Sequence, residues 1–218
     1  MRPKALDLFC GAGGASKGLH DAGFDVTGVD IKPQPNYPFA FHQADALTFP
    51  LEGYDFIWAS PPCQDYSALK LFAGHLRGKL IPEVRTRLTA TGVPFVIENV
   101  VGSELVNPIV LCGSMFGLGV WRHRLFECSP PILMVPICQH PEVRGPVDVT
   151  GLGGPIAERK KNTGGNPRKP KNLEHARAVM GINWMTRPEL SQAIPPAYSE
   201  FIGRIAIAAM RIETALAD

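Results

Sequence analysis

One cysteine stands where a thiol could react. Cys63 directly follows Pro61 and Pro62, at the end of the apolar run 54–60. A thiol at the tip of a strand, held in a rigid turn, suits a nucleophile. The alternative is a small buried residue, because cysteine is common in cores. A free thiol has a pKa of about 8.5, so activation would need positive neighbours.

Further charged residues stand at points where they could meet that thiol. Glu98 ends a second apolar run, and sequential parallel strands often lie side by side, so the two loops become neighbours. Arg122 and Arg124 alternate on one face of an extended segment and could supply positive charge. Taken alone, Glu98 could be a solvated cap, and the two arginines could belong to a surface strand.

A glycine-rich turn and two acids suggest a nucleoside pocket. Gly11, Gly13 and Gly14 follow a strand and open a helix, which allows close approach of a ligand to the backbone. Asp30 ends the second strand, where a carboxylate can bind both ribose hydroxyls, and Asp45 could accept a hydrogen bond from an adenine amino group. The alternatives are a simple tight turn, a loop cap and a helix start. No phosphate-gripping Gly-Lys-Ser/Thr is present, which disfavours a nucleoside triphosphate.

Alternating strands and helices would position these side chains. The pattern predicts strands at 5–9, 25–30, 54–60 and 94–100, a weak strand or turn at 41–47, and a strand pair at 107–113 and 123–129. Helices are expected at 15–22, 79–90, 173–182 and 200–216. This order favours an α/β fold with a mostly parallel sheet, whose carboxyl edge is the usual ligand site.

Composition limits the protein class. The chain has 218 residues, 45% of them hydrophobic, which fits one domain with a small appended lobe. No apolar run approaches the length of a membrane span, so we expect no membrane partner. The five cysteines are irregularly spaced, which favours reduced thiols in a cytoplasm. Cys112, Cys128, Cys138 and His140 fit no paired Cys-x-x-Cys pattern, so we expect no metal.

The net charge of +2 hides an uneven distribution. Between Arg144 and Lys171, seven Lys or Arg stand against two acids, a local charge of +5, while the rest of the chain carries −3. Ten of these 28 residues are Gly or Pro, and no helical or strand period survives. We therefore expect a core at 1–135, a short basic segment at 136–172 and C-terminal helices at 173–218 that return to the core. A solvated linker is the alternative for the basic segment.

Five stretches together resemble the DNA cytosine-5 methyltransferases, especially the compact versions encoded by bacteriophages. They are "DLFCGAGGASKGL", "SPPCQDYS", "FVIENV", "MFGLGVWRHRLFE" and "IPPAYSEFIG", in the order seen in that family. The resemblance implies a methyltransferase sheet with S-adenosylmethionine at the glycine turn. It assigns Cys63 as the nucleophile, Glu98 as the residue that grips the cytosine edge, and Arg122 and Arg124 as cations lining the site.

The resemblance also leads to residue-level expectations. Cofactor contacts are expected at Phe9, Gly11, Gly13, Gly14, Asp30, Ile31, Asp45, Ala46, Pro61 and Ser199. DNA contacts are expected at Gln64, Ser67, Arg159, Lys160, Lys161, Arg168 and Lys169. The sequence departs from the family at Val120, where Gln is usual, and at Asp30, where Glu is more common. The recognition region is also short, and we expect a monomer.

Four functions compete at this stage. The first is methylation of carbon 5 of cytosine in DNA, at a short degenerate site on a flipped-out base. The second is the same chemistry on RNA or a free nucleotide, because the resemblance extends to a tRNA-methylating branch. The third is a catalytically silent DNA-binding relative, which the intact set of Cys63, Glu98, Arg122 and Arg124 disfavours. The fourth is methylation of an exocyclic amino group, which would use an aromatic residue where Cys63 stands.

Overall fold

A computed structural model describes residues 1–62, 80–140, 145–150 and 168–217 of the chain. The strands are β1 (Lys4–Leu8), β2 (Asp25–Asp30), β3 (Ala40–Gln43), β4 (Phe56–Ala59), β5 (Phe95–Asn99), β6 (Ile109–Leu111) and β7 (Arg124–Ser129). The helices are α1 (Gly14–Ala22), α2 (Leu80–Thr91), α4 (Leu173–Met180), α5 (Arg187–Gln192) and α6 (Pro196–Ala217), with a short 3-10 helix η2 (Gly113–Phe116). Every strand expected from the pattern is present.

The strands form one mixed sheet in the order β3-β2-β1-β4-β5-β7-β6. The strands β1 to β5 pair in parallel, whereas β7 is antiparallel to both β5 and β6. The expected α/β class with a mostly parallel sheet is confirmed. Because β1, β2, β4 and β5 run the same way, their carboxyl ends share one edge, and the loops that follow them meet there.

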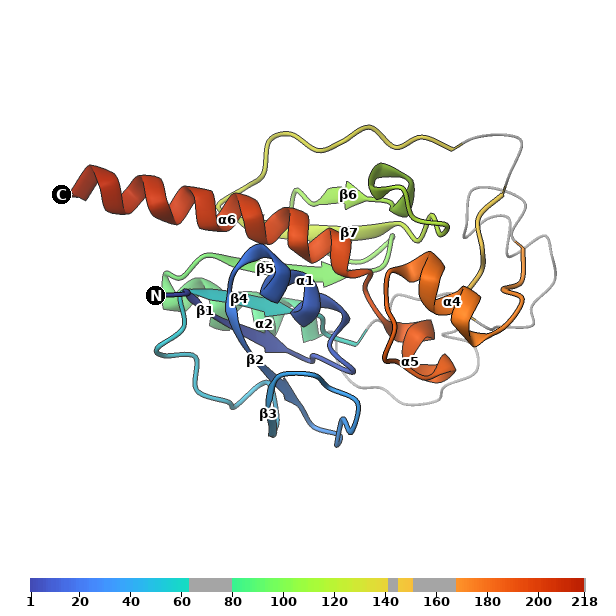
Figure 1. The fold of residues 1–218 in the computed structure, drawn as a ribbon. Helices are drawn as coiled ribbons and strands as arrows, with labels where there is room; N and C mark the ends of the chain where they lie inside the picture. Colours follow the sequence, from blue (N-terminus) through green and yellow to red (C-terminus); the bar gives the residue numbers. More distant parts are fainter. Residues whose placement is uncertain (63–79, 141–144, 151–167, 218) are drawn as a thin grey trace.

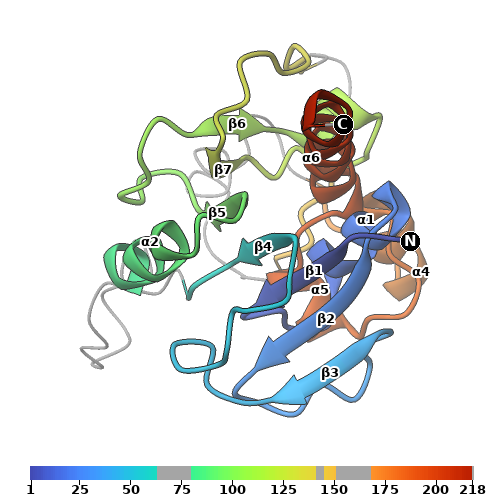
Figure 2. The same ribbon diagram turned by 90° about the vertical axis from the view of Figure 1, so that its left-hand side faces the viewer.

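The sheet is covered by helices on both faces (Figure 2). Successive residues of a strand point to opposite faces, so β4 feeds two cores. Trp58 packs in a cluster with residues of α1 and α6, whereas its neighbour Ile57 packs in a second cluster with Val84 and Leu88 of α2. All four residues of β4 are buried, as expected for a central parallel strand.

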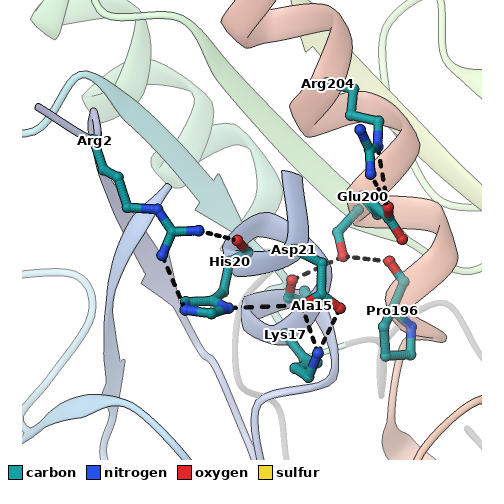
Figure 3. Close-up of polar contacts among 9 residues, drawn as sticks. Arg2, Ala15, Lys17, His20, Asp21, Pro196, Glu200 and Arg204 are labelled. Atoms are coloured by element: carbon teal, nitrogen blue, oxygen red, sulfur yellow. Dashed lines mark hydrogen bonds and ion pairs between the residues drawn. The ribbon is translucent and has the colours of Figure 1, made fainter. Parts of the chain in front are cut away.

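Helices α1 and α6 lie against each other at close range. A side chain at Gly18 would place its Cβ 2.0 Å from the carbonyl oxygen of Pro196, so only glycine fits this contact. The Ser199 hydroxyl donates to the carbonyl oxygens of Ala15 and Pro196, at 2.8 and 3.1 Å. Figure 3 shows this junction, with exposed pairs such as Arg204–Glu200 around it. The last motif of the chain therefore closes against the helix that follows the glycine turn.

A third apolar cluster forms a small lobe around α4 and α5 (Figure 1). It includes Val147 and Val149, which are 4% and 2% exposed, at the start of the segment expected to be irregular. Val147 forms a parallel bridge with Arg168. The prediction that this segment has no regular structure is less accurate at its two ends. The alternating valines at its start pack into the core, and one of them pairs with the residue near its end. Residues 151–167 lie outside the described residues.

Two features of the C-terminal helices were not expected. Helix α5 begins with a capping box, in which Thr186 and Glu189 satisfy each other's backbone N–H groups. That pattern was visible in the sequence. Helix α6 begins at Pro196 rather than at residue 200, because proline is tolerated in a first helical turn.

Within the described residues, no helix has the length and apolarity needed to cross a bilayer.

Candidate active site

Asp30 accepts hydrogen bonds that fix the conformation of the glycine turn. Gly11 N donates to Asp30 Oδ2 at 3.0 Å, and Lys32 N donates to Asp30 Oδ1 at 2.9 Å. Phe9 and Gly11 have positive φ angles of 59° and 48°, which is uncommon for a phenylalanine. Among the described residues, no atom lies within 4 Å of the position of a Cβ at Gly11, so this side of the turn is open with respect to them. The turn therefore exposes its backbone beside a half-buried carboxylate.

Asp45 is a second acid at the carboxyl edge of the sheet, where Asp30 also lies. It lies just after β3, and its Oδ1 accepts a hydrogen bond from Leu47 N at 2.9 Å. Ile31 is 57% exposed beside Asp30, whereas Ala46 is buried and offers its carbonyl oxygen to Arg87 at 2.7 Å. An open glycine turn, an acid at the end of a parallel strand and an exposed apolar side chain suit an adenosine group. These residues fit S-adenosylmethionine at the ends of β1, β2 and β3.

Three of the expected cofactor residues make packing contacts in the structure. Gly13 caps the start of α1, and Gly14 lies so close to the backbone of Ile194 that a Cβ there would be 2.4 Å from its carbonyl oxygen. Ser199 is fully buried, and its hydroxyl is committed to the α1–α6 junction. These contacts hold the start of α1 in place.

Glu98 lies buried at the end of β5, beside an arginine. The ion pair between Glu98 Oε1 and Arg124 Nε measures 3.3 Å. Burial raises the pKa of Glu98 above its usual range, although Arg124, Ser60 and Arg122 each lower it. The structure thus brings together Glu98, Arg122 and Arg124, as the sequence predicted. A raised pKa favours the protonated form of the carboxyl group.

The arginine motif is fixed by the C-terminal part of the chain. Arg122 Nη2 donates to the carbonyl oxygen of Ser191 at 2.7 Å, and the Tyr198 hydroxyl donates to the carbonyl oxygen of Arg122 at 2.8 Å. Tyr198 comes from the stretch "IPPAYSEFIG", so the last motif holds the arginines as well as α1. Arg122 is thereby tied to α5 through its side chain and to α6 through its carbonyl oxygen.

Asn99 is a positioning residue that sequence reasoning missed. Its Nδ2 donates to the carbonyl oxygen of Pro61 at 2.9 Å, and its Oδ1 accepts from Val100 N at 2.9 Å. Asn99 is buried, at 1% exposure. It therefore fixes the proline turn that leads to Cys63. The sequence feature that could have identified it is its position directly after Glu98 in "FVIENV".

Several expected residues lie outside the described part of the chain. These are Cys63, Gln64, Ser67, Arg159, Lys160 and Lys161. Pro61 and Pro62 are described and lie at the carboxyl end of β4, so the chain enters Cys63 at the edge that holds Glu98. Arg168 and Lys169 are exposed, and Arg168 Nε donates to the carbonyl oxygen of Gly145 at 3.1 Å.

Comparison with known proteins gives a family for the first part of the chain. Residues 3–107 match the model of the family described as "C-5 cytosine-specific DNA methylase". Residues 3–107 are a C-5 cytosine-specific DNA methylase domain. The match covers the glycine turn, Asp30, Asp45, the proline turn and Glu98. The family match supports a methyltransferase, and membership of this family implies the use of S-adenosylmethionine.

Solved structures show the same fold beyond the methylase domain. A prophage-encoded E. coli protein, described as a DNA modification methyltransferase, has a TM-score of 0.65 at 17% identity, over 95% of this chain and 99% of that one. The Dnmt2 methyltransferase of S. pombe has a TM-score of 0.62 at 12% identity, over 96% and 99% of the two chains. At these identities the likeness shows the fold alone. No curated protein matched in sequence.

Proposed function

We propose that the enzyme transfers a methyl group from S-adenosylmethionine to carbon 5 of cytosine in DNA, through a covalent adduct with Cys63 on a flipped-out base. The observation that carries this proposal is the buried pair of Glu98 and Arg124 beside the proline turn. It lies at the same sheet edge as Asp30, so the base and the cofactor would meet there. We further propose that the enzyme works as a monomer in a cytoplasm.

Cys63 makes carbon 5 reactive. Its thiolate adds to carbon 6 of cytosine, and the electron pair of the 5,6 double bond moves toward carbon 5 and the ring. Carbon 5 would then bond to the methyl group while the methyl–sulfur bond of the sulfonium breaks, which leaves a neutral thioether. Loss of the carbon 5 proton to a base and departure of the thiolate restore the double bond. This divides one difficult step into two easier ones.

Glu98 stabilises the ring while the thiolate is attached. Addition at carbon 6 places negative charge on ring nitrogen 3, and a protonated carboxyl can donate a hydrogen bond to that atom. Burial favours the protonated carboxyl, in agreement with the raised pKa of Glu98. Arg124 holds the carboxyl in place and adds positive charge next to the thiol turn. Both effects depend on low exposure to water.

Asp30 and the glycine turn place the cofactor. S-adenosylmethionine supplies an electrophilic methyl group on a sulfonium centre. The remaining acceptor sites of the Asp30 carboxylate can take the ribose hydroxyls, while Gly11 N holds that carboxylate in position. Asp45 can accept from the adenine amino group, because only Leu47 N engages its Oδ1 in the described residues.

DNA binding would use the basic segment. The atoms that react lie inside the stack of a duplex, so the target base must be flipped out. Basic side chains such as Arg159, Lys160 and Lys161 would contact phosphates, which gives affinity without reading sequence. The segment is short, so we propose a degenerate target of roughly two to four bases, because few side chains are available to read base edges.

The competing substrate is RNA or a free nucleotide, since the chemistry at carbon 5 would be identical. The deciding experiment incubates the enzyme with labelled S-adenosylmethionine and, separately, duplex DNA, single-stranded DNA, tRNA and dCMP. We expect label in DNA, and bisulfite sequencing of that DNA should show short degenerate contexts. The Cys63→Ala variant serves as the inactive control. Label confined to tRNA or dCMP would overturn the DNA assignment, and one strict six-base site would overturn the degenerate target.

A further inference from the structure

Four potential metal ligands converge beside the arginine motif. They are Cys112, His123, Cys138 and His140, and their ligand atoms all lie within 4.8 Å of one another. Cys112 follows β6, and His123 directly precedes β7. Cys138 and His140 belong to the segment after β7, which runs back above β6 (Figure 1). Three separate stretches of chain thus bring their sulfur and nitrogen atoms to one point.

We propose that this cluster binds a zinc ion. Two thiolates and two imidazoles are a common ligand set for zinc, with Zn–S bonds of about 2.3 Å and Zn–N bonds of about 2.0–2.1 Å. A tetrahedron with these bonds separates neighbouring S and N ligands by about 3.5 Å. The S–N distances are 3.3 Å for Cys112–His140, 3.5 Å for Cys138–His123 and 3.0 Å for Cys138–His140. The ligand atoms already have nearly the spacing that zinc requires.

Neighbouring side chains support this arrangement. The Ser114 hydroxyl lies 3.2 Å from Cys112 Sγ and 3.6 Å from Cys138 Sγ, where it can donate a hydrogen bond to a thiolate. The His140 ring stacks on Trp121, with centroids 3.9 Å apart and planes 4° apart, which fixes the ring orientation. Partners that orient ligands in this way are typical of built metal sites.

The zinc would be structural. Four protein ligands fill a tetrahedron and leave no open position for water or substrate. On binding, Cys112 and Cys138 each release a proton to solvent, and their two negative charges balance the charge of the ion. This balance matters, because Arg122 and Arg124 flank His123 in the sequence. A neutral site can stand next to these cations without repulsion.

The site would link two parts of the enzyme, and this consequence rests on the proposed function. His123 lies between Arg122 and Arg124, so coordination would fix the backbone that carries both arginines. Cys138 and His140 lie at the start of the basic segment 136–172, whose entry would be anchored to the same ion. Zinc would thereby hold the DNA-contacting segment at a set position relative to Glu98.

Sequence spacing does not indicate this cluster. The spacing of Cys112, Cys138 and His140 contains no Cys-x-x-Cys pair, and His123 lies within the arginine motif. Cys128, which spacing alone places among the candidates, contacts the carbonyl oxygen of Phe126 at 3.8 Å instead. Cys128 is therefore a matched control, a second thiol in the same region that does not belong to the cluster.

Metal analysis of the purified chain tests the site. We expect equimolar zinc in the wild type and in Cys128→Ser, measured by mass spectrometry of the metal after dialysis. Cys138 is exposed, so Cys138→Ser should fold yet bind zinc at least about 100-fold more weakly, because it loses a direct ligand. Cobalt added to the metal-free protein should give the absorption of a tetrahedral thiolate site in Cys128→Ser and not in Cys138→Ser.

Circular dichroism and cofactor binding serve as folding controls for both variants. The proposal fails if the reduced wild type binds neither zinc nor cobalt, or if Cys138→Ser keeps equimolar zinc. A Cys112–Cys138 disulfide found in freshly purified protein, together with failure to bind zinc after reduction, would also overturn it. These measurements need no DNA and no methyl transfer, so they can fail or succeed independently of the proposed function.

Discussion

Asp30 and Glu98 are both acids at the carboxyl ends of parallel strands, and their surroundings differ. Asp30 is half-buried, and backbone N–H groups of Gly11 and Lys32 hold its two oxygens. Glu98 is buried, and burial raises its pKa even though Arg124 lies 3.3 Å away. The backbone N–H groups orient the oxygens of Asp30 as acceptors, whereas burial favours a protonated carboxyl at Glu98, which can donate a hydrogen bond. In the proposed mechanism, this sheet edge therefore has a cofactor side at Asp30 and a base side at Glu98.

The largest effect should come from the base side. Glu98→Gln keeps the size of the side chain, but its amide cannot exchange a proton with ring nitrogen 3. We expect kcat to fall about 100- to 10,000-fold, the usual worth of a positioned acid or base. Calorimetry should show unchanged affinity for S-adenosylmethionine. Equal losses in both measurements would mean that the two sides do not act separately.

A substitution on the cofactor side should weaken cofactor binding and leave kcat nearly unchanged. Asp30→Asn removes the charge that accepts from ribose and from Gly11 N. Loss of a charge-assisted hydrogen bond costs about 1.5–3 kcal/mol, so the Kd for S-adenosylmethionine should rise about 10- to 150-fold. At saturating cofactor, kcat should stay within a few-fold of wild type. Unchanged affinity would move the cofactor to another pocket.

Asn99 should affect only the base side. Asn99→Ala removes the donor to the Pro61 carbonyl, so the turn that leads to Cys63 is no longer fixed. A lost hydrogen bond of about 1.4 kcal/mol corresponds to roughly a tenfold fall in kcat. The KM for DNA and the Kd for the cofactor should not change. A fall in thermal stability without any change in kcat would assign Asn99 a purely structural role.

Asp7 at the end of β1 lies between the two sides. Burial, together with the charges of Asp30 and Glu98, raises its pKa to about 7, although hydrogen bonds from Ser16 lower it. The folded state therefore binds this proton more tightly than the unfolded chain does. The stability that the proton contributes is full below about pH 4 and is lost as pH rises through 7.

Asp7→Asn should remove this dependence. Across that window, the stability of the wild type should fall relative to the variant by at most about 1.4 kcal/mol per pH unit. Urea unfolding at pH 5, 6, 7 and 8 measures the difference. Parallel curves for the two proteins would show that Asp7 is ionised throughout and that the two sides are not coupled through it.

The cofactor side and Glu98 could be predicted because they depend on local order along the chain. A strand that ends in a glycine turn, followed by acids at later strand ends, places Asp30 and Glu98 on one edge in any parallel sheet. The α1–α6 junction and the support of Arg122 by Ser191 and Tyr198 depend on contacts across long sequence separations. No local pattern encodes them.

The third apolar cluster also depends on long-range contacts that a local sequence pattern does not predict. Val147 and Val149 enter it from a stretch rich in glycine and proline, and what decides their burial is the partner surface of α4 and α5. The cluster of Cys112, His123, Cys138 and His140 likewise depends on three segments meeting. Spacing rules detect ligands that are close in sequence and miss those that only the fold brings together.

The most direct test of the central claim is covalent trapping on DNA that carries 5-fluorocytosine. Fluorine cannot leave carbon 5 as a proton does, so the adduct should persist after methyl transfer. We predict a cofactor-dependent complex that survives denaturation, with the label on the peptide that contains Cys63, and no complex with Cys63→Ala. A complex that still forms with Cys63→Ala, or methyl transfer to cytosine without any trapped adduct, would contradict the account.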